Sequence, residues 1–118
     1  MNTHQAVATL AALAHEHRLR IYRLLIEAGP VGLNAGTIAA RLKLLPSSLT
    51  FHVQHLHRAG LVTQERNSRQ LIYAADFGVM KGLVAYLTEN CCAGSRCKPA
   101  ADSPRRAGAR ESRATKAA

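Results

Sequence analysis

A change in hydrophobic periodicity at Gly60 constrains the fold of this chain more than any other feature of its sequence. Before Gly60, apolar residues recur every three or four positions, which is typical of amphipathic helices. After it, the helical spacing is lost, and the segments 61–66 and 70–74, joined by the polar residues 67–69, are typical of two strands of a hairpin. Helical spacing returns from residue 77. We therefore expect a mainly α-helical domain that contains a small β-hairpin (α+β).

Five helices and two strands are expected from these patterns. The helices cover residues 5–14, 18–28, 35–42, 46–59 and 77–90, and the strands cover 61–66 and 70–74. Asn34 is suited to cap the third helix, and Gly29 and Gly60 are suited to end the second and fourth. The side chains expected to face the core are Ala6, Leu10, Leu13, Leu19, Ile21, Tyr22, Leu25, Ile26, Ile38, Ala39, Leu42, Leu49, Val53, Leu56, Val79, Met80, Leu83, Val84 and Leu87.

The net charge of the chain points to a polyanionic partner. Its 118 residues include 16 Lys and Arg against 7 Asp and Glu, a formal charge of +9 with a pI near 10.4. Such an excess favours nucleic acid. A membrane surface would attract the same charge, but the sequence has no apolar run long enough to cross a bilayer and no signal-peptide pattern. We expect a cytoplasmic protein without a membrane partner, whose modest core favours association with a second subunit.

The composition changes again at residue 98, where large apolar side chains stop. Residues 98–118 are rich in Ala, Arg, Ser and Pro, with six basic and two acidic residues. A segment of this kind cannot offset the entropy that is lost on ordering. We therefore expect one domain over residues 1–97 and a disordered basic tail over 98–118. The tail either adds non-specific affinity for DNA or dominates binding, as in an architectural DNA-binding protein.

Two short helices joined by a tight turn and followed at once by a hairpin form a winged helix-turn-helix. The segments Leu13–Leu25 and Pro46–Leu56, together with residues 59–62, resemble the ArsR/SmtB family of metal-responsive bacterial repressors. The resemblance covers about residues 5–90. It implies a homodimer, built through the first and last helices, that binds double-stranded operator DNA. An enzyme is not expected, because the chain has no glycine-rich phosphate loop, no paired catalytic carboxylates and no Cys-x-x-Cys on a βαβ unit.

In such a fold the helix over 46–59 enters the major groove and the hairpin turn lies at the minor groove. The side chains expected to contact DNA are Ser47, Ser48, Thr50, Gln54 and His55 on the helix, and Arg66 and Arg69 at the hairpin. His52 either packs beside the apolar stripe or reads a base, and Phe51 either touches a thymine methyl or packs. The alternative for the hairpin is a solvated tip. The histidines expected at the surface or as helix caps are His4, His15, His17 and His57.

All three cysteines lie within seven residues, at Cys91, Cys92 and Cys97. Soft sulfur ligands clustered in a reducing compartment indicate a site for a thiophilic metal or metalloid. Arsenite and antimonite, As(III) and Sb(III), bind three thiolates in a pyramid, whereas zinc prefers four tetrahedral ligands. Adjacent sulfurs can serve one centre only if the helix has ended by Cys91, because neighbours on a helix point about 100° apart. No organic cofactor is expected.

The resemblance narrows the site further. The familiar arsenic site of the family puts Cys-x-Cys on the helix before the recognition helix, but residues 33–37 contain no sulfur. The family's zinc site needs histidine on the last helix, and residues 77–90 contain none. Other members bind arsenite through cysteines at the end of that helix. The implied function is a repressor that leaves DNA when As(III) or Sb(III) binds these three cysteines. The alternatives are a thiol redox sensor and a repressor that responds to zinc, cadmium or lead.

Overall fold

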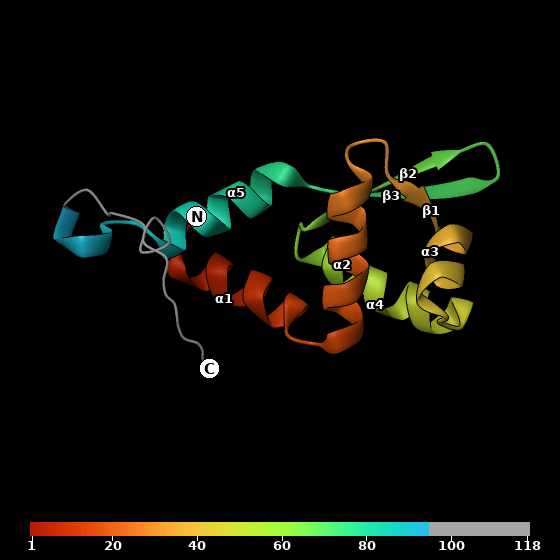
Figure 1. Cartoon of the computed structure of the whole chain (residues 1–118), viewed down its shortest axis with the longest axis horizontal. Coiled ribbons are helices and arrows are strands. Elements are labelled where there is room, and N and C mark those ends of the chain that lie inside the picture. The colour runs from red at the N-terminus through yellow and green to blue at the C-terminus, as the bar shows by residue number, and fades with distance from the viewer. Residues whose placement is uncertain (95–118) are drawn as a thin grey trace, which may run out of the picture. The chain divides into compact units, whose positions relative to one another are not determined.

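The computed structural model describes residues 1–94 (Figure 1). Met1–Leu87 forms one compact unit, and Thr88 begins a second one, of which residues 88–94 are described. The elements are α1 (Thr3–Leu13), α2 (Glu16–Ala28), β1 (Leu33–Asn34), α3 (Ala35–Leu42), α4 (Pro46–Arg58), β2 (Val62–Asn67), β3 (Gln70–Ala75), α5 (Phe77–Leu87) and the 3₁₀ turn η1 (Cys91–Gly94). This order of helices and antiparallel strands confirms the expected winged helix-turn-helix. Cys97 and the expected tail over 98–118 lie outside the described residues.

The ends of three helices follow chemistry that is readable in the sequence. Asn34 caps α3, its Oδ1 accepting the backbone N–H of Thr37 at 2.8 Å. Pro46 opens α4, where a missing N–H removes no helical hydrogen bond. Gly29 and Gly60 follow α2 and α4 with a φ of 82° each, which glycine adopts without a Cβ penalty. The predicted limits of α2, α3 and α4 are confirmed to within two residues.

The hairpin belongs to a three-stranded antiparallel sheet with the order β1-β3-β2. β2 and β3 form the expected hairpin, closed by a two-residue turn at Ser68 and Arg69. β1 was not predicted, because a two-residue strand shows no periodicity; it pairs Leu33 with Tyr73. Gly32 precedes it at a φ of 75°, and a Cβ there would overlap the carbonyl oxygen of Tyr73. The chain therefore needs glycine where it enters β1.

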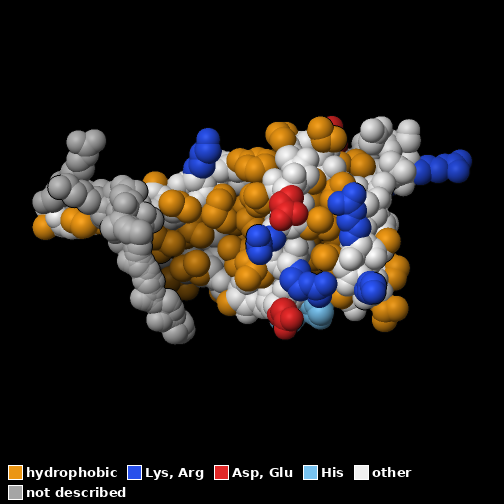
Figure 2. All heavy atoms as spheres, viewed as in Figure 1, with side chains coloured by type: hydrophobic (Ala, Val, Ile, Leu, Met, Phe, Trp, Pro, Cys, Tyr) orange, Lys and Arg blue, Asp and Glu red, His pale blue; other side chains and the backbone are white. Residues whose placement is uncertain are grey.

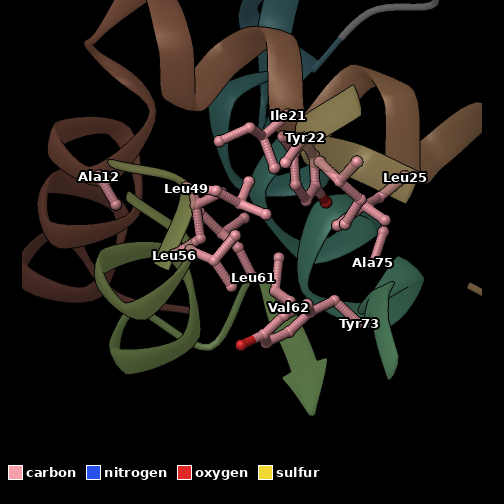
Figure 3. Close-up of a cluster of buried hydrophobic side chains, with 13 residues drawn as sticks. Ala12, Ile21, Tyr22, Leu25, Leu49, Leu56, Leu61, Val62, Tyr73 and Ala75 are labelled. Atoms are coloured by element: carbon pink, nitrogen blue, oxygen red, sulfur yellow. The ribbon is translucent and has the colours of Figure 1, made fainter. Parts of the chain in front are cut away.

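The core lies between α2, α4 and the sheet (Figure 3). Figure 3 shows side chains of α2 and α4 facing those of the hairpin, among them Tyr73, which is 1% exposed. The buried cluster contains Ala12, Ile21, Tyr22, Leu25, Ile38, Ala39, Leu49, Val53, Leu56, Leu61, Val62, Tyr73 and Ala75. Burial of each large side chain contributes about 1.5–3 kcal/mol. This cluster therefore fixes the orientation of α4 against the wing.

The predicted inward faces of α1, α2 and α5 were partly wrong. Leu19 on α2 is 46% exposed, because the buried face of that helix centres on Ile21 and Leu25. Three residues of α1 and α5 that were expected in the core are 41–56% exposed: Leu10, Val84 and Leu87. The apolar stripes of α1 and α5 are thus wider than the area that the rest of the unit covers. No helix within residues 1–94 is long and apolar enough to cross a membrane.

Candidate nucleic-acid interface

The recognition helix α4 has a buried face and an outer face. Leu49, Val53 and Leu56 are at most 1% exposed and hold α4 on the core. Phe51 points outward and is 58% exposed, and its ring lies edge-on to that of His55 with centroids 4.8 Å apart. The outer face is therefore accessible along the middle of the helix, with one aromatic side chain available to a thymine methyl.

The DNA contacts predicted on α4 differ in exposure. Ser47 and Thr50 are exposed. Ser48, Gln54 and His55 are half-buried. The hydroxyl of Thr50 donates to the carbonyl oxygen of Pro46 at 3.0 Å and keeps its acceptor capacity. The contacts of all five with DNA stay predictions.

Gln54 links α4 to the wing. Its Nε2 donates to Oε1 of Gln64 on β2 at 3.2 Å. Burial raises the pKa of Tyr73 on β3, and a hydrogen bond with the Gln54 side chain opposes that rise. The amide of Gln54 therefore lies between helix and sheet, and its contact with Gln64 occupies only one of its two N–H donors.

The wing carries the two arginines that the sequence singled out. Arg66 lies on β2 opposite Leu71, and Arg69 lies in the hairpin turn; both are exposed. Figure 1 shows the hairpin extending beyond the helices at one end of the unit, and Figure 2 shows Lys and Arg side chains over the part that holds α2 and the wing. Both guanidinium groups are accessible to phosphate oxygens, and their contact with DNA stays a prediction.

A group of histidines lies on the edge of α4 that faces α2. His52 is 8% exposed, so of its two alternatives the packed one is confirmed. The centroid of its ring lies 4.6 Å from that of His15 and 5.5 Å from that of His17. Its Nδ1 accepts a hydrogen bond from Nε of Arg18 at 3.4 Å. We refer to these side chains as the histidine cluster: His15, His17, Arg18, His52 and His55.

The charges around His52 all have the same sign. Burial lowers its pKa first, and His15, Arg18, His17 and His55 lower it further. The pKa of His55 is lowered as well, by desolvation and then by Arg18, Arg58 and His15. The His52 imidazole is therefore neutral at neutral pH, which suits its role as an acceptor for Arg18.

Three histidines serve as caps or lie at the surface, as expected: His4, His15 and His57. His15 caps α2, its Nδ1 accepting the backbone N–H of His17 at 3.1 Å. The Nδ1 of His57 on α4 lies 2.9 Å from the carbonyl oxygen of Val62, the first residue of β2. His4 is exposed on α1. His17 is half-buried, and the prediction missed its place in the histidine cluster.

The cysteines follow the end of the last helix. α5 ends at Leu87, three residues earlier than predicted, and Cys91 opens η1 with its N–H donating to the carbonyl oxygen of Thr88 at 3.1 Å. Cys92 has a left-handed φ of 57°, so the two adjacent cysteines do not continue a helix. Both residues are exposed. Within residues 1–94 no three His, Cys, Asp or Glu side chains are grouped to hold a metal ion, and Cys97 lies outside that range.

Comparison with known proteins places this fold in a family. A helix-turn-helix domain family matches residues 13–65. The chain is 31% identical over 91 residues to the transcriptional activator HlyU of Vibrio cholerae serotype O1, which covers 77% of this chain and 82% of HlyU. An ArsR-like transcriptional regulator from Rhodococcus sp. RHA1 is 26% identical, with a TM-score of 0.64 over 76% of this chain and 81% of its own. The chain belongs to the ArsR/HlyU family of winged-helix transcriptional regulators.

Two further solved ArsR/HlyU-type structures match the unit that carries α4 and the wing. HlyU from Vibrio cholerae superposes with a TM-score of 0.61 at 30% identity, over 78% of this chain and 99% of its own. A protein described as a possible transcriptional regulator for arsenical resistance superposes with a TM-score of 0.60 at 28% identity, over 67% of this chain and 79% of its own. The shared part is the winged helix-turn-helix fold.

The histidine cluster is a feature of the candidate site that the sequence did not predict. Arg18 and His52 are 34 positions apart, and periodicity carries no information on contacts at that separation. A weak signal was present, because His52 and His55 are three residues apart on one helix and thus lie on the same edge. The partner residues at the start of α2 could be assigned only once the packing of the two helices was known.

Proposed function

We propose that this ArsR/HlyU regulator is an arsenite-responsive repressor. As a homodimer it binds operator DNA when it is free of metalloid, and it dissociates when As(III) or Sb(III) is bound by the thiolates of Cys91, Cys92 and Cys97. α4 reads the major groove and the wing contacts the adjacent backbone through Arg66 and Arg69. The exposed outer face of α4 and the exposed wing arginines support this assignment of the DNA surface.

Dimerisation through α1 and α5 is supported by the apolar side chains on these helices. The two helices pack against each other, and the hydroxyl groups of Thr3 and Tyr86 are hydrogen-bonded. Four apolar residues on them are 41–58% exposed: Val7, Leu10, Val84 and Leu87. Burial of this surface against a second copy would contribute about 25 cal/mol for each Å² of apolar area. A dimer places two recognition helices for two half-sites one turn of DNA apart.

The observation that carries the ligand assignment is the backbone around the two described cysteines. Because α5 ends at Leu87 and Cys92 is left-handed, the sulfurs of Cys91 and Cys92 are not held in the divergent directions of a helix. Two adjacent exposed thiols suit a soft ligand. Cys97 would supply the third thiolate. The relative described as a possible regulator for arsenical resistance adds support for the same ligand class.

The mechanism couples the ligand to DNA through the last helix. The cysteine segment follows α5 directly in the chain, and α5 carries part of the proposed dimer surface. Drawing three thiolates together reorders the residues after Leu87. A change in how α5 meets its partner then alters the separation of the two recognition helices, which weakens binding to paired half-sites.

A thiol redox sensor is the second candidate, and the adjacent exposed cysteines favour it. A structure of HlyU from Vibrio cholerae is described as the reduced form, and HlyU itself is described as an activator. Release of DNA by peroxide, with reversal by a thiol reductant and no metalloid, would support this candidate. A response to zinc, cadmium or lead is the remaining alternative, and zinc would need a fourth ligand besides the three thiolates.

The ligand site is tested by measuring As(III) binding to the reduced protein by arsenic X-ray absorption and by stoichiometry. We expect one As(III) per chain with three As–S bonds, and fewer As–S bonds in Cys91→Ser, Cys92→Ser and Cys97→Ser. Ser95→Ala is the matched control, because it changes the same segment and keeps all three thiols. Unchanged coordination in Cys92→Ser would reject the three-thiolate site.

A further inference from the structure

The recognition helix is bordered by different groups on its two edges. Toward the wing, Gln54 donates to Gln64 on β2. On the opposite edge, His52 packs against the start of α2. The charges of Arg18 and His15 help to lower the pKa of His55 on the same edge. A helix in the major groove runs between two phosphate backbones. The wing therefore approaches one backbone, and the histidine cluster lies on the side of the other.

We propose that the histidine cluster binds a backbone phosphate of DNA and takes up a proton as it does so, so that DNA binding becomes tighter at lower pH. This inference rests on the proposed function, in which α4 and the wing form the DNA surface. It assigns the start of α2 as a third DNA contact, and it makes that contact dependent on protonation.

The charge of the cluster supports a phosphate as its partner. The charged groups that act on His52 come from the two elements that meet there: His15, His17 and Arg18 at the start of α2, and His55 on α4 itself. Every one of them is basic, and the acidic first residue of α2, Glu16, is exposed and is not among the groups that shift the pKa of His52. A phosphate supplies the negative charge that such a set lacks, and its oxygens accept several charge-assisted hydrogen bonds at once.

The cluster also has donors available at its rim. His15 is exposed and His55 is half-buried, whereas His52 is covered. The Nδ1 of His17 is buried and so does not belong to this rim; it has no hydrogen-bond partner among the residues that the structure describes. A neutral imidazole offers one donor and an imidazolium offers two. Protonation of a rim histidine therefore adds a donor and a charge where a phosphate would lie.

The expected pH dependence follows from linkage. Desolvation and neighbouring cations lower the pKa of His52 and His55 in the unbound protein, and a phosphate within hydrogen-bond distance favours a charged imidazolium. Histidine titrates near pH 6.5 when unperturbed, so this change falls in the physiological range. Uptake of one proton per cluster strengthens DNA binding by up to about tenfold for each unit that the pH falls.

The test uses the full reduced protein and a fluorescein-labelled duplex of its own promoter DNA, which the proposed function requires it to bind. Fluorescence anisotropy gives the Kd from about pH 8 to about pH 6 at constant ionic strength. His15→Asn removes one imidazole ring of the cluster and keeps an N-cap acceptor for α2. His55→Gln removes a second ring. His4→Gln is the matched control, since His4 is an exposed histidine on α1 outside the cluster.

We expect tighter binding at lower pH for the unaltered protein and for His4→Gln, with a shallower dependence for His15→Asn and His55→Gln. Circular dichroism at each pH confirms that every variant remains folded. If the Kd of the unaltered protein does not depend on pH, or depends on pH equally in all variants, the inference is overturned and the DNA-binding function stands. Absence of DNA binding at every pH overturns both.

Discussion

Replacing Gly32 with alanine should destabilise the protein far more than the same change at Gly60. Both glycines have positive φ, 75° and 82°, and a Cβ costs about 1–2 kcal/mol in that region. At Gly60 a Cβ would meet no atom within 4 Å, so this is the whole expected loss. At Gly32 it would overlap the carbonyl oxygen of Tyr73, so β1 must separate from β3.

The separation of β1 from β3 adds the loss of about two backbone hydrogen bonds, at about 1 kcal/mol each. We therefore expect Gly32→Ala to lower the free energy of unfolding by about 3–4 kcal/mol, against about 1–2 kcal/mol for Gly60→Ala. Urea unfolding followed by circular dichroism, at one fixed protein concentration, measures both values. Equal losses for the two variants would refute the close approach of Gly32 to β3.

Three further predictions test charge, protonation and assembly. Arg69→Ala should weaken DNA binding and reduce the slope of log K against log salt by about 0.9. A titration of Kd with salt measures this slope, and an unchanged slope would place the hairpin turn away from phosphate. Because the pKa of His52 is lowered in the folded state, His52 binds a proton more readily in the unfolded chain. The free energy of unfolding should therefore fall as the pH drops below about 6.5. His52→Gln should flatten that fall in urea unfolding at several pH values, and an identical profile would exclude His52 as its source. Leu87→Glu should shift the protein from dimer to monomer in light scattering, whereas Val31→Glu, at an 84% exposed site outside α1 and α5, should not.

The sequence predicted best those elements whose signals are local. Asn34, Pro46 and Gly60 act within one turn of the helices that they start or end, and the chain folds at each of them as expected. The core face of α4 was also predicted correctly, because Leu49, Val53 and Leu56 follow the helical period and are covered by a single core.

Features that depend on contacts between distant segments were not predictable in the same way. Gly32 and β1 are set by Tyr73, and periodicity cannot report a two-residue pairing. The exposure of Leu10 and Leu87 was missed because an apolar stripe shows which residues avoid water, and not whether the same chain or a second one covers them. The DNA and cysteine assignments rest on side-chain chemistry, and they stay predictions.

The coupling between ligand and DNA is the central claim, and the most direct measurement of it is the Kd of the reduced protein for its own promoter DNA. Anisotropy is recorded with separate titrations of As(III), Zn(II) and hydrogen peroxide. The account predicts that As(III) releases the protein from DNA, that Zn(II) and peroxide do not, and that Cys92→Ser stays bound while Ser95→Ala is released. Release by zinc or peroxide alone, or no release at all, would contradict the arsenite assignment.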